Sequence, residues 1–235
     1  FKHTIEKHRK QELVTFQKNA KCKFKNLDLL DIAFHHRSFS NEHNEAPINN
    51  ERLEFLGDSV LSLAIAEEVF RRYPDMPEGE LVKRHHVVVS TVALAKVARE
   101  LRLGPHIRLG KGERLTGGAD KDSILADTME AIFGATYMTL GREAARELVL
   151  RLIAPLLDDE AVLNSGRDWK TDLQELVASR AWGEVRYEVS GEGPDHARHY
   201  TAKAVVAGQV AGTGEGTSKK EAERLAAEAA YRVLL

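Results

Sequence analysis

The sequence has one cysteine, no long apolar run and no excess of positive charge. The lone Cys22 excludes an internal disulfide framework and a zinc site built on cysteines. It also fits the reducing cytoplasm, where we expect the protein to be located. No apolar stretch approaches the roughly 20 residues that span a bilayer, so we expect no membrane partner. The formal net charge of −2 argues neither for nor against a nucleic-acid ligand.

What is present divides the 235 residues into two parts. Up to Leu157 the chain consists of segments rich in Ala, Leu, Glu and Arg, which indicate helices. Residues 158–167 are polar and lack periodicity, which is typical of a linker. We therefore expect an all-α domain over residues 1–157 and a second domain over 168–235.

The second domain has a different pattern. Asp168 to Ser179 predicts a short amphipathic helix, and residues 185–216 alternate apolar with polar side chains between Gly and Pro turns. That alternation predicts a three-stranded antiparallel sheet. Ser218 is a suitable N-cap for a closing helix. The expected fold is a small α+β domain of order α-β-β-β-α.

An apolar helix predicted over residues 49–70 carries an unexpected row of acids. Glu51, Glu54 and Asp58 repeat at i, i+3 and i+7, so they share one line along the helix beside its leucine stripe. No Lys or Arg lies within residues 53–67 to neutralise them. Either these acids face open water or a cation holds them.

A second apolar helix, predicted over residues 123–138, repeats the anomaly. It is apolar nearly all round, hence buried, yet it carries Asp127 and Glu130 with no basic residue inside the segment. Packed side by side, the two helices would bring Glu54, Asp58, Asp127 and Glu130 to one cavity. Four carboxylates without Cys or His describe a site for Mg²⁺ or Mn²⁺. The alternative is that each pair caps a helix start or lines a solvated surface.

These residues lie in motifs that resemble a known family. The stretch ERLEFLGDSVL (51–61) resembles the signature of ribonuclease III, the enzymes that cut double-stranded RNA. The resemblance continues in HRS (36–38), LGKGE (109–113) and residues 116–137. Farther on, the chain resembles the double-stranded RNA-binding domain that is appended in this family, in the motifs DWKTDLQE, GPDH and SKKEAE. The match runs in the family's order from about residue 12 to the end.

The resemblance implies a metal-dependent endoribonuclease. It assigns metal ligation to Glu54, Asp58, Asp127 and Glu130, with Asp58 and Glu130 as catalytic residues, and Mg²⁺ as cofactor with Mn²⁺ as a substitute. Water is the best candidate nucleophile because no Ser-His-Asp or Cys-His set is evident. Its attack leaves 5′-phosphate and 3′-hydroxyl ends. By family resemblance a homodimer makes staggered cuts with short 3′ overhangs, and ribosomal RNA precursors are the usual substrate.

Further residues take roles only through the resemblance. Glu51 and Glu78 match acidic positions near the metal site or the dimer interface. Phe55 matches an aromatic that inserts into the partner subunit, although an ordinary core Phe is the local alternative. Lys111 is a candidate RNA-binding residue of the nuclease domain. The expected RNA-binding residues of the second domain are Gln174, Glu175, His196, Ser218, Lys219 and Lys220.

Two other functions compete with the endoribonuclease. A non-catalytic double-stranded RNA-binding dimer would keep the fold as a scaffold, and loss of one of the four acids would mark it; all four are present. A metal-dependent hydrolase of small phosphate compounds would leave the RNA-binding domain without a role.

Overall fold

The structure is a computed structural model that describes residues 5–24, 26–43, 48–165, 167–194 and 198–235. The chain forms two compact units, Phe1–Gly166 and Arg167–Leu235, which we call the helical unit and the C-terminal unit. Among the described residues, none of the helices has both the length and the apolar character needed to cross a membrane.

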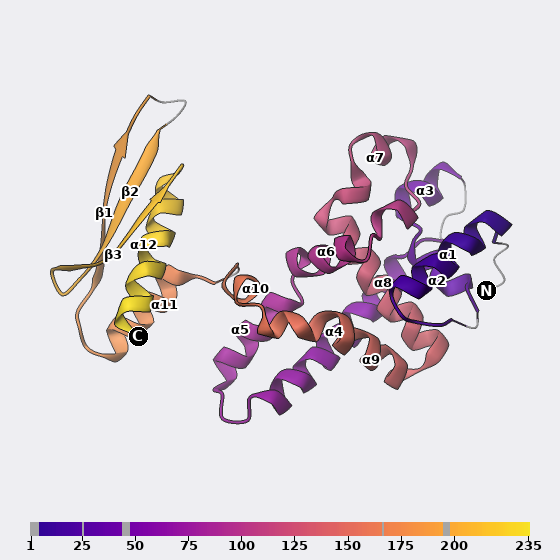
Figure 1. Ribbon diagram of the computed structural model, residues 1–235, viewed down its shortest axis with the longest axis horizontal. Helices are drawn as coiled ribbons and strands as arrows, with labels where there is room; N and C mark the ends of the chain where they lie inside the picture. The colour runs from indigo at the N-terminus through magenta and orange to yellow at the C-terminus, as the bar shows by residue number, and fades with distance from the viewer. Residues whose placement is uncertain (1–4, 25, 44–47, 166, 195–197) are drawn as a thin grey trace. The chain divides into compact units, whose positions relative to one another are not determined.

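The helical unit contains only helices as regular elements in its described part (Figure 1). They are α1 (Lys7–Asn19), α2 (Asp28–Ala33), α3 (Arg37–Glu42), α4 (Glu51–Arg72), α5 (Glu78–Val88), α6 (Thr91–Glu100), α7 (Lys111–Leu115), α8 (Asp122–Leu140), α9 (Arg142–Ile153) and α10 (Glu160–Ser165). Three short 3₁₀ helices complete it: η1 (Gly104–His106), η2 (Gly118–Asp120) and η3 (Ala154–Asp158).

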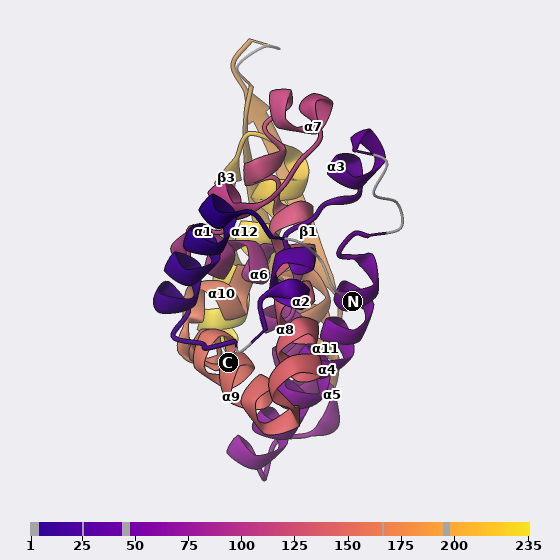
Figure 2. The same cartoon turned by 90° about the vertical axis from the view of Figure 1, so that its right-hand side faces the viewer.

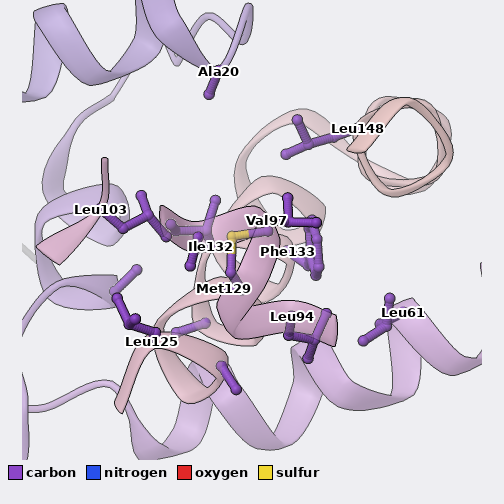
Figure 3. Close-up of a cluster of buried hydrophobic side chains, with 14 of the residues drawn as sticks. Ala20, Leu61, Leu94, Val97, Leu103, Leu125, Met129, Ile132, Phe133 and Leu148 are labelled. Carbon is purple, nitrogen blue, oxygen red and sulfur yellow. The ribbon is translucent and has the colours of Figure 1, made fainter. Parts of the chain in front are cut away.

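Helix α8 runs through the centre of the helical unit, as its all-round apolar sequence predicts. In Figure 3 the α8 side chains Leu125, Met129, Ile132 and Phe133 lie among residues from surrounding helices. These neighbours include Leu61 of α4, Leu94 and Val97 of α6, and Leu148 of α9. Each of the four α8 side chains is almost completely buried. The burial of α8 means that any polar group on it must find a partner.

Short helices occupy two segments between the longer elements. Residues 102–120 hold η1, α7 and η2, and residues 158–167, expected as a linker, hold α10 instead. Asp159 accepts hydrogen bonds from the backbone N–H groups of Ala161 and Val162, which start α10, and Val162 is buried in the helical unit. Helices this short show no readable periodicity.

The C-terminal unit has the predicted α-β-β-β-α order. It comprises α11 (Trp169–Ser179), β1 (Val185–Glu192), β2 (His199–Val206), β3 (Gln209–Gly216) and α12 (Lys219–Leu234). The strands form an antiparallel sheet in the order β1-β2-β3, with Val189 opposite Ala202 and Ala202 opposite Gly214. The predicted fold class is thus confirmed.

Glycines explain how β3 accepts a helix on its face. A Cβ on Gly212 or Gly214 would clash with the backbone of α12, whose facing residues include the buried Ala226 and Ala230. Small residues on both sides therefore let strand and helix approach closely, and Trp169, Leu173 and Val177 of α11 join this core.

Candidate metal centre and RNA-binding surfaces

The candidate metal centre depends on a close contact between α4 and α8. A Cβ on Gly57 would clash with the backbone carbonyl oxygen of Glu130, and a Cβ on Gly134 would clash with that of Leu53. The two helices therefore pack backbone to backbone, one glycine on each side. The contact places Glu54, one turn before Gly57, beside the acids of α8. The sequence analysis missed this glycine pair, although a glycine inside each apolar helix was the available signal.

The structure brings three of the four predicted metal ligands together. Carboxylate oxygens of Glu54, Asp127 and Glu130 all lie within 4.8 Å of one another, and the three residues are half-buried. Asp58 is exposed and is not part of this cluster. Its charge nevertheless raises the pKa of both Glu130 and Glu54, so it lies on the same side of the site.

Burial and mutual repulsion make this cluster unfavourable without a cation. Burial, followed by the charges of Asp58, Asp127 and Glu54, raises the pKa of the Glu130 carboxyl to about 8. Burial is also the first cause of the raised pKa of Glu54, and Asp127 is the next. Burial raises the pKa of Asp127, and the charges of His36 and Arg37 lower it by a smaller amount.

This donor set fits a hard divalent cation. Its ligands are carboxylate oxygens from two rigid helices, and no His or Cys belongs to the cluster found among the described residues. A bound cation removes the repulsion that raises these pKa values.

The supporting acids lie outside the cluster of three. Glu51 is exposed, accepts a hydrogen bond from Asn49 Nδ2 (3.1 Å) and faces Arg37 Nη1 at 3.7 Å. Glu78 is exposed in the first turn of α5. Phe55 is 80% exposed, which rules out the alternative of an ordinary core phenylalanine. Such a large exposed aromatic is available to a partner.

Four of the six predicted RNA-binding residues lie on the two helices of the C-terminal unit. Gln174 and Glu175 are exposed on α11, and Lys219 and Lys220 are exposed in the first turn of α12. Ser218 caps α12, since its side chain accepts from the backbone N–H of Glu221. His196 lies outside the described residues.

A half-buried carboxylate cluster that fits a divalent cation and a separate α-β-β-β-α unit with exposed lysines define a class: metal-dependent enzymes that act on structured RNA. Two family profiles match the chain, the Ribonuclease-III-like family over residues 26–157 and the double-stranded RNA binding motif over residues 169–234.

Individual relatives agree with the family profiles. Ribonuclease 3 of Mycobacterium bovis is 53% identical over 210 residues, which cover 88% of this chain and 87% of the relative. Ribonuclease 3 of Thermobifida fusca is 51% identical over 207 residues, covering 88% and 86%. A crystal structure of the nuclease domain of ribonuclease III from Campylobacter jejuni has a TM-score of 0.57 and 38% identity, and covers 61% of this chain and 94% of that domain.

The chain therefore belongs to the ribonuclease III family, whose activity is endoribonuclease cleavage of double-stranded RNA. The family implies a divalent metal, and α4 and α8 together hold an acidic cluster. The predicted family, enzyme class and RNA ligand are confirmed.

Proposed function

We propose that the protein hydrolyses double-stranded RNA with Mg²⁺, which Glu54, Asp127 and Glu130 would hold with Asp58 as the fourth ligand. Mn²⁺ substitutes for Mg²⁺. One observation carries the proposal. Two helices in backbone contact hold three half-buried carboxylates within 4.8 Å, which is costly unless a cation is present.

The chemistry follows from this donor set. When bound, a divalent ion stabilises negative charge on the phosphoryl oxygens and lowers the pKa of water near it. The chain supplies the carboxylates that fix the ion between α4 and α8, with Asp58 and Glu130 as the catalytic acids. Water attacks phosphorus and the 3′-oxygen leaves, which yields 5′-phosphate and 3′-hydroxyl ends. Glu51 and Glu78 support the site from its exposed margin.

The C-terminal unit supplies the affinity for duplex RNA. A-form RNA exposes 2′-hydroxyls in a shallow minor groove, which suits the exposed polar side chains of Gln174 and Glu175. Lys219 and Lys220 lie at the N-terminus of α12, where the helix dipole strengthens the attraction for phosphates. Ser218 fixes this helix start, and His196 contacts the next minor groove. The nuclease domain (1–157) thus carries out cleavage, and the RNA-binding domain (168–235) recognises the duplex.

Phe55 supports a homodimer. A Campylobacter jejuni structure concerns a region of the nuclease domain involved in dimer formation. In this protein, Phe55 projects from α4 at 80% exposure and inserts into a second copy of the chain. A dimer with two metal centres makes staggered cuts that leave short 3′ overhangs.

We place this activity in the cytoplasm, in the processing of ribosomal, messenger and transfer RNA precursors.

The test is cleavage of an end-labelled 60-base-pair RNA duplex with Mg²⁺, next to a single strand of the same sequence. We expect cuts in the duplex only, with 5′-phosphate ends and paired nicks offset toward the 3′ sides. Tight duplex binding without cleavage in Mg²⁺ or Mn²⁺ would identify a non-catalytic RNA-binding dimer instead. Equal hydrolysis of small phosphodiesters after removal of residues 168–235 would identify a small-molecule hydrolase.

A further inference from the structure

The backbone around Arg37 is held rigidly beside the metal centre. Arg37 is the first residue of α3, and the preceding residues are tied to two other segments. His35 O accepts a hydrogen bond from the backbone N–H of Asn50 (2.9 Å), the residue directly before α4. The backbone N–H of His36 donates to Arg108 O (3.1 Å). The start of α3 is therefore fixed against the start of the helix that carries Glu54.

The side chain of Arg37 is less constrained than its backbone. This side chain is 69% exposed, and its Nη1 lies 3.7 Å from Glu51 Oε1, too long for a hydrogen bond. By contrast, Arg71 on α4 holds Glu67 at 2.5 Å. Arg37 thus keeps its N–H donors available at the margin of the acidic cluster.

Arg37 is also a permanent positive charge that acts on the cluster. Its charge lowers the pKa of Asp127 and of Glu54, against the upward effect of burial. His36 acts in the same direction on Asp127, and burial lowers the pKa of His36 itself.

The negative charge at the metal centre gives a positively charged side chain of the protein a possible role in the reaction. The cluster of three carboxylates, with Asp58 and Glu51 at its edge, carries more negative charge than one divalent ion offsets. A phosphodiester brings another negative charge, and the transition state concentrates charge on its phosphoryl oxygens. A guanidinium can offer two parallel N–H groups to such oxygens, which an ammonium cannot.

We propose that Arg37 is a catalytic residue that donates hydrogen bonds to a non-bridging oxygen of the phosphodiester being cut. The inference rests on the proposed function, since it needs the phosphodiester to meet the cluster of Glu54, Asp127 and Glu130. It assigns to α3 a part in the reaction that is separate from holding the cation.

The test compares Arg37→Gln and Arg37→Lys with the intact protein, and uses Arg71→Gln as the matched control. Arg71 is an exposed, ion-paired arginine on α4. Single-turnover cleavage of a duplex with Mg²⁺ measures the rate of the chemical step. Calorimetry measures Mn²⁺ binding without RNA, and filter binding in EDTA measures duplex affinity. Circular dichroism shows whether each variant is folded.

We expect Arg37→Gln to slow the single-turnover rate about 100-fold or more, as for loss of one transition-state donor. We expect Arg37→Lys to recover only part of this loss. Mn²⁺ affinity should stay equal or increase in Arg37→Gln, because a repelling positive charge is removed, and duplex affinity should change less than about threefold. Arg71→Gln should cleave like the intact protein.

Two results would overturn the inference. One is an unchanged rate in Arg37→Gln, and the other is a loss of Mn²⁺ affinity that accounts for the loss of rate, which would make Arg37 a residue that positions the carboxylates. A neutral methylphosphonate at the cut site gives an independent readout. It should slow the intact protein, and it should add little to the defect of Arg37→Gln. If the intact protein cuts no duplex at all, the proposed function itself fails.

Discussion

Glu130 shows at the scale of one residue why a metal centre is expected. Its carboxyl is half-buried on α8 and faces other carboxyls, so its pKa rises to about 8. Spacing put Asp127 and Glu130 on one face of an apolar helix, and we predicted that they meet Glu54 and Asp58 on a second such helix. Spacing could not show that Asp58 stays exposed outside the cluster of three, since that depends on how the two helices cross.

The raised pKa of Glu130 predicts how stability depends on pH without metal. A carboxyl whose folded pKa, about 8, exceeds its ordinary value of 4.5 binds its proton more tightly in the folded state. Its contribution is complete below pH 4.5 and is lost as the pH rises through about 8. In EDTA, Glu130→Gln should therefore match the intact protein near pH 5. At pH 8.5 it should be more stable, by on the order of 1 kcal/mol after allowance for solvent screening.

Urea denaturation at the two pH values measures this difference. A variant that is less stable than the intact protein at pH 8.5 would contradict the electrostatic account of Glu130. Adding Mn²⁺ at pH 8.5 should reverse the order, because the intact site gains binding energy that the variant lacks.

At the scale of elements, the contact between α4 and α8 sets the geometry of the site. Gly57→Ala should destabilise the protein by about 2–4 kcal/mol, because the added methyl meets backbone rather than a movable side chain. Gly79→Ala is the matched control: Gly79 lies in α5 with nothing within 4 Å of the added carbon. That change should be neutral or stabilise by up to about 1 kcal/mol. Equal effects of the two substitutions in urea denaturation would show that the close contact does not exist.

The first turn of α12 makes a separate prediction about recognition. Replacing Lys219 and Lys220 together by Gln should weaken duplex binding and lower the slope of log affinity against log salt by about 1–2, because two phosphate contacts are lost. Lys203→Gln, an exposed lysine on β2, is the charge control and should leave the slope nearly unchanged. An unaltered slope in the double variant would remove these lysines from the RNA-binding surface.

Elements differ in how far the sequence predicts them. Helix α8 and the strands β1, β2 and β3 have clear periodicity or composition, and the sequence analysis placed them. Helices α7 and α10 are too short for periodicity. Asp159 caps the start of α10, whereas the first N–H of α7 donates to Glu42, which is distant in the sequence. The glycines of α4, α8 and β3 are visible in the sequence, but the backbone that each one meets depends on how two elements are positioned, which the sequence does not show.

At the scale of the whole molecule, the exposure of Phe55 predicts self-association. An aromatic at 80% exposure on the helix of the metal centre is costly in water unless a partner covers it. Its exposure could not be decided from the sequence, because a core phenylalanine can have the same spacing. Phe55→Asp should convert the dimer to a monomer in sedimentation velocity at micromolar concentration. Val92→Asp, a change of another exposed apolar residue at 62%, should leave the dimer intact. A monomeric intact protein, or a dimer that survives Phe55→Asp, would contradict the role of Phe55.

The most direct test of the whole account compares Glu130→Gln with the intact protein on a long uniform RNA duplex with Mg²⁺. Glutamine keeps the shape of the glutamate side chain but cannot supply the negative charge that the cluster needs to hold a cation. We predict that cleavage falls by at least about 100-fold while duplex affinity, measured in EDTA, stays the same, because recognition belongs to the C-terminal unit. Cleavage by Glu130→Gln at the rate of the intact protein would contradict the carboxylate mechanism.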